Sequence, residues 1–240
     1  MTYCVGVILA EGLIFASDSR THASVDSYAR FCKMTVFERA TERVLVLLSS
    51  GGLAATQTVI NILRRRAAGE APHIFSVDSM FDVANLVADA MRDIERRDGP
   101  FLNSGGLRFN ASFILGGQIA GEEMRLFRIY AEGNFIEAGT DTIYLQTGET
   151  KYGKPILDLA VITNVSLEDA AKCVLVSFDA TMHSTLSVGM PIDLLCYEKD
   201  SLKVTMERRF EAHDDGFARL MQQWHAGARR VFGELPPLTW

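Results

Sequence analysis

The sequence predicts an α+β fold in which antiparallel sheets are covered by layers of helices. The first observation is the order of the predicted elements: a block of strands, two helices, more strands, two helices, a strand pair and a final helix. The second is that the strands cluster instead of alternating singly with helices, which disfavours parallel βαβ units. The chain has 240 residues, 48% of them hydrophobic, and no linker or repeat divides it. We therefore expect a single domain over residues 1–240.

The first block consists of short runs rich in Val, Ile, Leu and Phe. Glu11-Gly12 joins the first two runs as a tight turn, which predicts a hairpin. The polar segment at residues 19–31 has no clear period and predicts a loop or an irregular strand. The predicted strands of this block are residues 3–10, 13–17, 33–38 and 43–48.

Two helices follow this block. Ser49-Ser50-Gly51-Gly52 ends the fourth strand, and the apolar spacing of Val59, Ile60 and Leu63 predicts one buried face of a helix at residues 53–68. A second helix is predicted from about residue 78 to 97. Asp78 or Ser79 caps its start, and Asp98-Gly99-Pro100 is expected to end it.

The rest of the chain returns to strands and then to helices. Gly116-Gly117, Glu132-Gly133 and Gly139 are interpreted as turns between strands, and Ser166 with Asp169 as a helix cap. The predicted strands are residues 111–115, 124–130, 134–138, 142–146, 191–197 and 203–210, and the predicted helices are residues 154–162, 166–182 and 217–231.

The charge balance disfavours several partners. The chain carries 24 Lys and Arg against 30 Asp and Glu, a net charge of −6, without a lysine-rich tail. Nucleic acid is therefore an unfavourable partner. No apolar run approaches the roughly 18 residues of a membrane span, and the N-terminus lacks a signal-peptide pattern, so we expect a cytoplasmic protein without a membrane partner. Arg64-Arg65-Arg66 is interpreted as a solvated helix end.

Neither metal nor cofactor binding has a convincing motif. Cys4, Cys32, Cys173 and Cys196 lack zinc spacing and are interpreted as reduced core thiols. The histidines form no metal-binding pair. The segment at residues 148–155 resembles a phosphate-binding loop but ends in proline where the magnesium-binding hydroxyl would stand. We therefore expect no metal and no organic cofactor.

Thr2 is the first candidate for catalysis. It directly follows the initiator methionine and begins an apolar strand. Removal of Met1 would free the α-amine of Thr2, whose ordinary pKa of about 7.7 to 8.0 lets it act as a base near neutral pH. A single residue could then supply both the nucleophilic hydroxyl and the base that activates it.

Three further residues are predicted to lie beside Thr2. Asp18 ends the second strand and Lys33 begins the third, so both can approach the start of the first strand. A Lys held by an Asp places a positive charge near the Thr2 hydroxyl and favours its alkoxide, although a structural ion pair remains the alternative. Gly51, at a strand-to-helix turn, could donate its N–H to an oxyanion or serve only as a turn glycine.

These motifs together resemble the proteasome β-subunit family, and most of all its bacterial Anbu branch. The matching segments of the first sixty residues are Thr2-Tyr3-Cys4-Val5-Gly6-Val7, Phe15-Ala16-Ser17-Asp18-Ser19-Arg20, Lys33 and Ser50-Gly51-Gly52-Leu53-Ala54-Ala55-Thr56-Gln57. Ile114-Leu115-Gly116-Gly117 and residues 183–193 match later landmarks. The resemblance implies the N-terminal nucleophile hydrolase fold, a four-layer αββα sandwich, together with threonine-peptidase chemistry and assembly of identical subunits.

The resemblance also assigns site residues. It implies that Thr2 is the nucleophile and amine base, that Asp18 and Lys33 support it, and that Gly51 is the oxyanion donor. In the family, a conserved segment supports the α-amine of the N-terminal residue. Residues 183–189 correspond to this segment, and Ser187 is retained in it. Residues implied to contact substrate are Thr21, His22 and Ser49.

The sequence departs from the family pattern at three positions. Ser184 stands where the family has an acid, Val188 where it has a glycine, and Glu149 where proteasome subunits commonly place a serine. Loss of the acid weakens the expected orientation of the amine.

The resulting prediction is a threonine hydrolase that cleaves peptide or related amide bonds through an acyl-enzyme on Thr2. A non-catalytic assembly subunit, favoured by Ser184 and Val188, and an amidase or transpeptidase acting on small amides remain alternatives. The apolar C-terminal tail at residues 235–240, ending in Trp240, is expected to dock on a neighbouring subunit or to pack on its own.

Overall fold

The computed structural model describes residues 2–24, 27–69, 72–161 and 164–239. Its strands are β1 (Tyr3–Leu9), β2 (Gly12–Asp18), β3 (Arg20–Ser24), β4 (Ser27–Arg30), β5 (Met34–Arg39), β6 (Arg43–Gly51), β7 (Ala111–Ile119), β8 (Arg125–Ile129), β9 (Phe135–Glu137), β10 (Tyr144–Gly148), β11 (Ile192–Glu198) and β12 (Met206–Phe210). Its helices are α1 (Leu53–Ala67), α2 (Met80–Ser104), α3 (Lys154–Ala160), α4 (Leu167–Ser184) and α5 (Asp215–Glu234).

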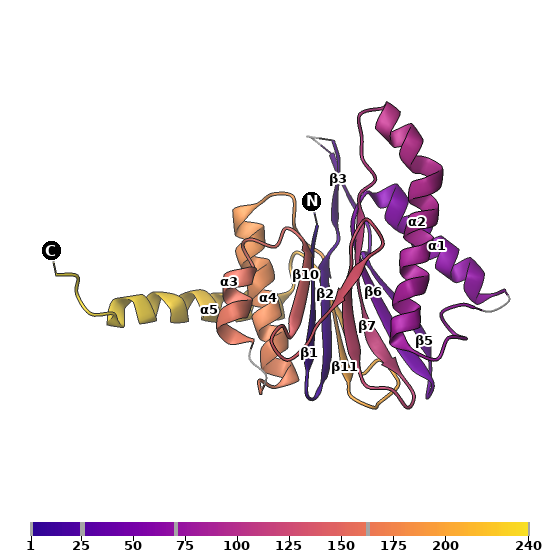
Figure 1. Ribbon diagram of the computed structural model, residues 1–240. Coiled ribbons are helices and arrows are strands. Elements are labelled where there is room, and N and C mark those ends of the chain that lie inside the picture. The colour runs from indigo at the N-terminus through magenta and orange to yellow at the C-terminus, as the bar shows by residue number, and fades with distance from the viewer. Residues whose placement is uncertain (1, 25–26, 70–71, 162–163, 240) are drawn as a thin grey trace.

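The two main antiparallel sheets stack face to face between two layers of helices (Figure 1). The first sheet, sheet I, has the strand order β10-β1-β2-β11-β12 and is covered by α3 and α4. The second, sheet II, has the order β5-β6-β7-β8-β9 and is covered by α1 and α2. The α+β prediction and the four-layer αββα arrangement are both confirmed.

Strands β1 and β2 are apolar along their whole length because both of their faces are buried. Tyr3, Val5 and Val7 pack against the helices of the α4 layer, whereas Cys4 and Phe15 face sheet II. Side chains alternate between the two faces of a strand, so a strand sandwiched between helices and a second sheet loses the polar alternation of a surface strand. This burial holds the N-terminal strand in the middle of the molecule.

The polar segment at residues 19–31 forms a separate ribbon of β3 paired with β4. Its register shifts between His22 and Ser24, as expected for an irregular strand. Ser19 joins this ribbon to β2, and its carbonyl accepts a hydrogen bond from the Phe31 N–H at 2.9 Å. The ribbon therefore continues directly from the end of β2 toward the start of β5.

The interpretation of Gly116-Gly117 as a turn was wrong, because both residues lie inside β7. A Cβ at Gly116 would lie 2.7 Å from the Phe15 ring and 2.8 Å from Leu126. A Cβ at Gly117, whose φ is +152°, would lie 1.9 Å from the Val44 carbonyl oxygen. Gly116 is required because the two sheets approach closely, and Gly117 because β6 approaches closely. Both residues are therefore part of the strand and not of a turn.

The expected end of the second helix at Asp98-Gly99-Pro100 was also wrong, since α2 continues to Ser104. Proline has a φ close to the helical value and removes one backbone donor, so a helix can contain it at a local cost. The helix ends at Gly105, whose N–H contacts the carbonyls of its last turn, and Gly106 follows with φ +73°. Ser79 caps the start by accepting a hydrogen bond from the Asp82 N–H.

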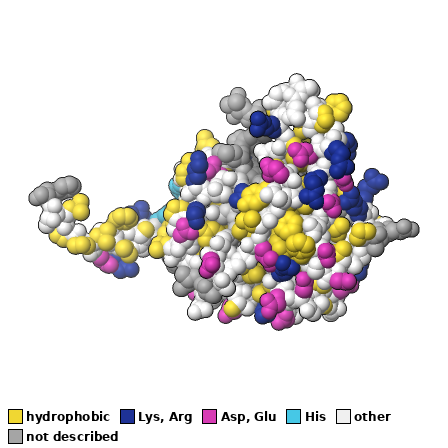
Figure 2. All heavy atoms as spheres, in the orientation of Figure 1, with side chains coloured by type: hydrophobic (Ala, Val, Ile, Leu, Met, Phe, Trp, Pro, Cys, Tyr) yellow, Lys and Arg dark blue, Asp and Glu magenta, His cyan; other side chains and the backbone are white. Residues whose placement is uncertain are grey.

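Helix α5 leaves the body of the molecule beyond its first three turns, after His225, whose ring contacts Asp179 of α4. Phe217 and Met221 are buried against the α4 layer, and the remainder of the helix projects outward with apolar side chains on its surface (Figures 1 and 2). Phe232 is 75% exposed. Residues 235–239 of the expected docking tail continue from it and are exposed, while Trp240 lies outside the described residues. Within the described chain, no helix has the length and apolar character to cross a membrane.

Replacing Gly116 by Ala tests the close approach of the two sheets. The added methyl meets Phe15 and Leu126 in a buried layer, so we expect the free energy of unfolding to fall by about 1–3 kcal/mol. Gly139→Ala is the matched control, because Gly139 is exposed and an added Cβ there has no other atom within 4 Å. Denaturant unfolding measures both variants. Equal stability of the two would contradict the proposed contact between the sheets.

Candidate active site

Thr2 immediately precedes β1, the strand that lies between β10 and β2 in sheet I. Only 8% of its surface is exposed. Its carbonyl accepts a hydrogen bond of 2.6 Å from the backbone N–H of Glu149. Gly148 has φ +86°, and a Cβ there would lie 1.9 Å from the same carbonyl oxygen. The glycine thus lets β10 close against Thr2 and fix its backbone.

Asp18 and Lys33 form a buried ion pair next to the N-terminal strand. The Lys33 Nζ donates to Asp18 Oδ1 at 2.7 Å and to the Arg20 carbonyl at 2.6 Å. Asp18 Oδ1 also accepts the Tyr3 N–H at 3.0 Å, and its Oδ2 accepts the Gly189 N–H at 3.4 Å. Asp18 therefore connects Lys33 to the residue that follows Thr2.

Burial is the largest influence on the Asp18 carboxyl and raises its pKa. The Lys33 ammonium and the N–H donors of Tyr3 and Gly189 act in the opposite direction, because they favour the charged form. A buried charge is tolerated when it has an opposite charge and hydrogen-bond donors around it. Asp18 has both, which is the arrangement needed to keep Lys33 oriented.

Most of the predicted site residues converge on one cavity of about 1000 Å³. They come from the start of β1, the ribbon, the start of β5 and the end of β6. The predicted residues that line it are Thr2, Thr21, Lys33, Ser49 and Gly51. Asp18 stands behind Lys33, to which it is bonded. The described side chains exclude that of His22, so its expected contact with substrate lies outside the described residues.

Gly51 ends β6, and only Gly52 separates it from the start of α1. Its φ is +104°, and a Cβ at this position would lie 2.4 Å from the Asn110 carbonyl oxygen. This conformation turns the chain sharply at the cavity wall. The turn brings the N-terminal end of α1, with its outward-pointing N–H groups, beside the same cavity as Thr2.

Ser187 belongs to the loop between α4 and β11. It follows α4, and its hydroxyl pairs with Thr185 Oγ1 at 2.8 Å. Ser187 does not line the cavity within the described part of the chain. The same loop nevertheless contacts the site through its Gly189 N–H, which reaches Asp18.

A group of hydroxyls on the cavity wall was missed by the sequence analysis. Thr147 Oγ1 lies 2.7 Å from both Ser50 Oγ and Ser112 Oγ, and the three residues come from β10, β6 and β7. All three line the cavity. Only Ser50 belongs to a motif named above, and nothing in the sequence groups Ser112 and Thr147 with it. The only available signal was their placement on inward-facing positions near strand ends.

All four cysteines are free thiols, and three of them are buried. The expectation of a core thiol was wrong for Cys32, which is exposed and lines the cavity next to Lys33. Cys32 precedes β5 instead of lying inside it, so its side chain is not packed between the two sheets. Its thiol lies 3.6 Å from Asp193 Oδ2.

The chain is similar to solved structures over its full length. It is 44% identical to Anbu from Hyphomicrobium sp. strain MC1, covering 99% of this chain and 100% of that one, with a TM-score of 0.92. It is 42% identical to Anbu, an ancestral beta-subunit, from Yersinia bercovieri, covering 99% of each chain with a TM-score of 0.93. For the helical assembly of the Anbu complex from Pseudomonas aeruginosa, the identity is 45%, the coverage 99% and 98%, and the TM-score 0.95. No family model matches, and no curated protein matches.

Thiol labelling tests the placement of Cys32. We expect iodoacetamide to modify Cys32 first in the native protein, because burial raises the pKa of Cys173 and of Cys196 to about 11 and shields Cys4. Burial and the Asp193 carboxylate also raise the pKa of Cys32, so its labelling rate should rise about tenfold per pH unit through neutral pH. Peptide mass mapping reads the site, with Cys32→Ser as the control. Faster labelling of Cys173 or Cys196 would contradict this placement.

Proposed function

The chain belongs to the Anbu family of proteasome-like proteins, and from this premise we propose that it is an N-terminal threonine hydrolase. The proposed reaction cleaves peptide or related amide bonds through an acyl-enzyme on Thr2, after removal of Met1. The observation that carries the proposal is that Thr2 and Lys33 line the same cavity while Asp18 binds both Lys33 and the backbone next to Thr2.

In the proposed mechanism the free α-amine of Thr2 takes the proton of the Thr2 hydroxyl. The Oγ then forms a bond to the substrate carbonyl carbon, and the carbonyl oxygen becomes an oxyanion. Collapse of this intermediate breaks the amide bond, and the leaving amine receives the proton held by the α-amine. Water, activated by the same amine, then hydrolyses the ester and restores Thr2.

The surrounding residues support the charges of this reaction. The Lys33 ammonium is fixed by two hydrogen bonds, so it presents a stationary positive charge to the cavity. Gly51 and the N-terminal end of α1 lie on the cavity wall, where N–H groups favour an oxyanion. No part of this arrangement calls for a metal or an organic cofactor as a reactant.

A non-catalytic assembly subunit is the second candidate, and one observation favours it. The hydroxyls of Ser184 and Ser187 are occupied within their own segment, by the Ala180 carbonyl at 2.8 Å and by Thr185 at 2.8 Å. Among the described residues, neither hydroxyl contacts Thr2. The contacts that the resemblance implied between this segment and the α-amine of Thr2 are therefore missing for these two hydroxyls among the described residues.

Identical subunits are the proposed partners of this chain. The Anbu complex from Pseudomonas aeruginosa forms a helical assembly. The exposed apolar side chains of α5 and of residues 235–239 supply a surface that such an assembly could cover.

Comparison of short peptides with non-peptide amides would separate a peptidase from an amidase or transpeptidase that uses the same site.

Thr2→Ala tests the nucleophile. We expect turnover to fall to background, because the hydroxyl that forms the acyl-enzyme is gone, while the free energy of unfolding changes by no more than about 1 kcal/mol. Thr2→Ser is the matched control, since it keeps both the hydroxyl and the α-amine. Intact-mass measurement of protein from the native host first establishes that Met1 is removed. Unchanged turnover in Thr2→Ala would eliminate Thr2 from the mechanism.

Lys33→Ala tests the buried ion pair. The variant leaves Asp18 buried without its counter-ion, so we expect a loss of about 3 kcal/mol in the free energy of unfolding and a loss of turnover. Lys172→Ala is the control, because Lys172 forms exposed ion pairs on α4, which contribute at most about 1 kcal/mol. Denaturant unfolding and an amide-hydrolysis assay give the two readouts. Retained turnover would reduce Lys33 to a structural role.

A further inference from the structure

Arg128 is a cation placed in the gap between the two sheets. It belongs to β8, two residues after Leu126, whose methyl groups approach Gly6 of sheet I. Residues two apart in a strand share a face, so Arg128 also faces sheet I. It lines the cavity that contains Thr2 and a second, adjacent cavity of about 550 Å³. Arg128 therefore stands where the two cavities meet.

The guanidinium of Arg128 has no counter-ion among the residues that the structure describes. Its Nε is buried and has no hydrogen-bond partner among the described residues. Its Cζ lies 4.8 Å from the centroid of the Tyr130 ring, which stabilises a cation but cannot accept the N–H bonds of the guanidinium plane. A buried N–H group such as that of Nε is normally hydrogen-bonded, so this N–H is an unused donor for an anion.

The charged residues that line the Thr2 cavity are all basic, whereas the adjacent cavity also has Asp141 and Asp158 in its lining. Its charged lining residues among those described are Lys33, Arg64 and Arg128, with no Asp or Glu. Lys33 is neutralised by Asp18, which leaves two positive charges in a chain whose net charge is −6. Arg64 is an exposed residue near the end of α1 and forms no ion pair in the described part of the chain. A concave site of one sign concentrates ligands of the opposite sign.

We propose that the substrate of this site carries a carboxylate close to the amide bond that is cleaved, and that Arg128 binds this carboxylate. The proposal rests on the hydrolase function proposed above and specifies its substrate class. A guanidinium binds a carboxylate through two parallel N–H···O bonds, which gives both affinity and orientation. Arg64 adds positive potential at the outer part of the cavity. The carboxylate can belong to an acidic side chain or to a free C-terminus on the leaving side.

Hydrolysis of matched amides tests the preference. The probes are N-acetyl-Glu and N-acetyl-Gln amides of aminomethylcoumarin, which differ by one charge at nearly equal size. We expect kcat/KM to favour the Glu amide by at least about tenfold, the effect of a charge-assisted hydrogen bond, and the ratio to fall as sodium chloride is raised. A pair of dipeptides with a free or an amidated C-terminus distinguishes a terminal carboxylate from an acidic side chain. A neutral preference in both pairs would overturn the proposal.

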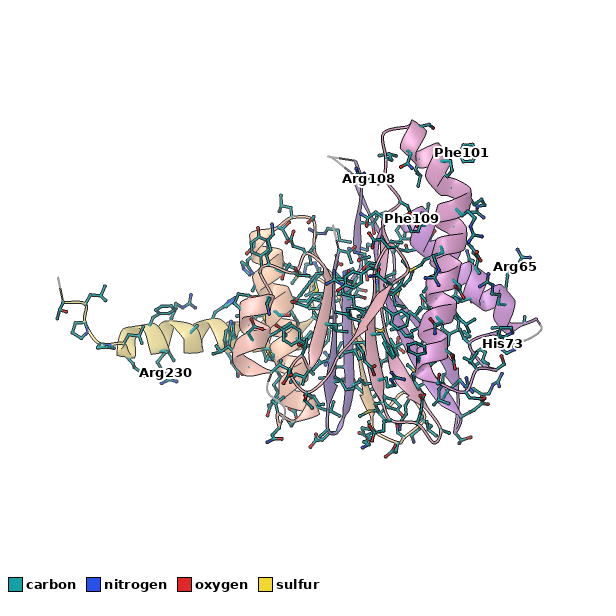
Figure 3. The ribbon with its side chains drawn as sticks, in the orientation of Figure 1. Arg65, His73, Phe101, Arg108, Phe109 and Arg230 are labelled. Carbon is teal, nitrogen blue, oxygen red and sulfur yellow. The ribbon has the colours of Figure 1, made fainter. Side chains whose placement is uncertain are left out.

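Arg128→Gln tests the residue itself. We expect the preference for the carboxylate to fall toward one, and Arg128→Lys to retain part of it. Arg65→Gln is the matched control, since it removes the same charge from an exposed position on α1 outside the cavity, where the side chain points away from the body (Figure 3). Equal ratios in Arg128→Gln and Arg65→Gln would overturn the proposal. If Arg128→Gln does not fold, Arg128→Lys and the salt dependence of the wild-type ratio decide the same question.

Binding separates this proposal from that of the hydrolase. Calorimetry on Thr2→Ala measures the affinity for N-acetyl-glutamate α-amide against N-acetyl-glutamine α-amide without any turnover. Tighter binding of the glutamate compound, lost in Thr2→Ala/Arg128→Gln, supports the anion site even when no amide is hydrolysed. Hydrolysis without a carboxylate preference, together with equal binding of both compounds, supports the hydrolase and overturns the anion site.

Discussion

The buried ion pair between Asp18 and Lys33 organises the candidate site. Asp18 stands at the end of β2, yet it binds the N-terminal strand, the residue before β5 and the loop after α4. These segments are far apart in the sequence, and one carboxylate brings them together. Because an unpaired charge in this position would be expensive, the ion pair fixes the relative placement of sheet I, sheet II and the loop. The cavity inherits its shape from this constraint.

The position of the cavity follows from the way that the sheets are stacked. In the middle of the sandwich, Phe15, Leu126 and Gly116 allow the sheets to approach closely and exclude a cavity. At the ends of β6 and β10, glycines turn the chain and the inward-facing side chains become polar, as Ser50 and Thr147 show. The same sandwich is therefore a tightly packed core along most of its length and a polar cavity at one end, where β1 begins.

Much of the site could be predicted because its residues lie at the ends of strands that are recognisable as apolar runs in the sequence. Thr2, Lys33 and Gly51 stand at such ends, and the structure places all three around one cavity. Arg128 could not be found in this way, because an arginine inside a strand is typical of a solvated face. Its inward orientation depends on which side of β8 meets the second sheet, and a single strand does not reveal that.

The fold prediction failed where a local signal competed with tertiary packing. Gly116-Gly117 has the composition of a turn, but the residues are small because other parts of the chain press on them. Proline commonly ends a helix, yet Pro100 lies inside α2. Both errors have one physical origin: a residue type that is frequent at boundaries is also the type that crowded or tolerant interior positions accept. Strand and helix existence depends on periodicity and was correct, whereas these boundaries depend on neighbours.

The hydrogen bond from the Glu149 N–H to the Thr2 carbonyl has a consequence for the timing of the proposed removal of Met1. Strand β10 closes over the start of β1, and the two are separated by more than half of the chain. During synthesis the N-terminus leaves the ribosome long before residue 149 exists, and in that interval an exopeptidase meets an extended, accessible end. Once β10 has paired with β1, Thr2 is held as an interior residue. Under the proposed function, removal of Met1 and pairing of β10 with β1 would therefore compete, and the length of chain between the two strands would set the time available for removal.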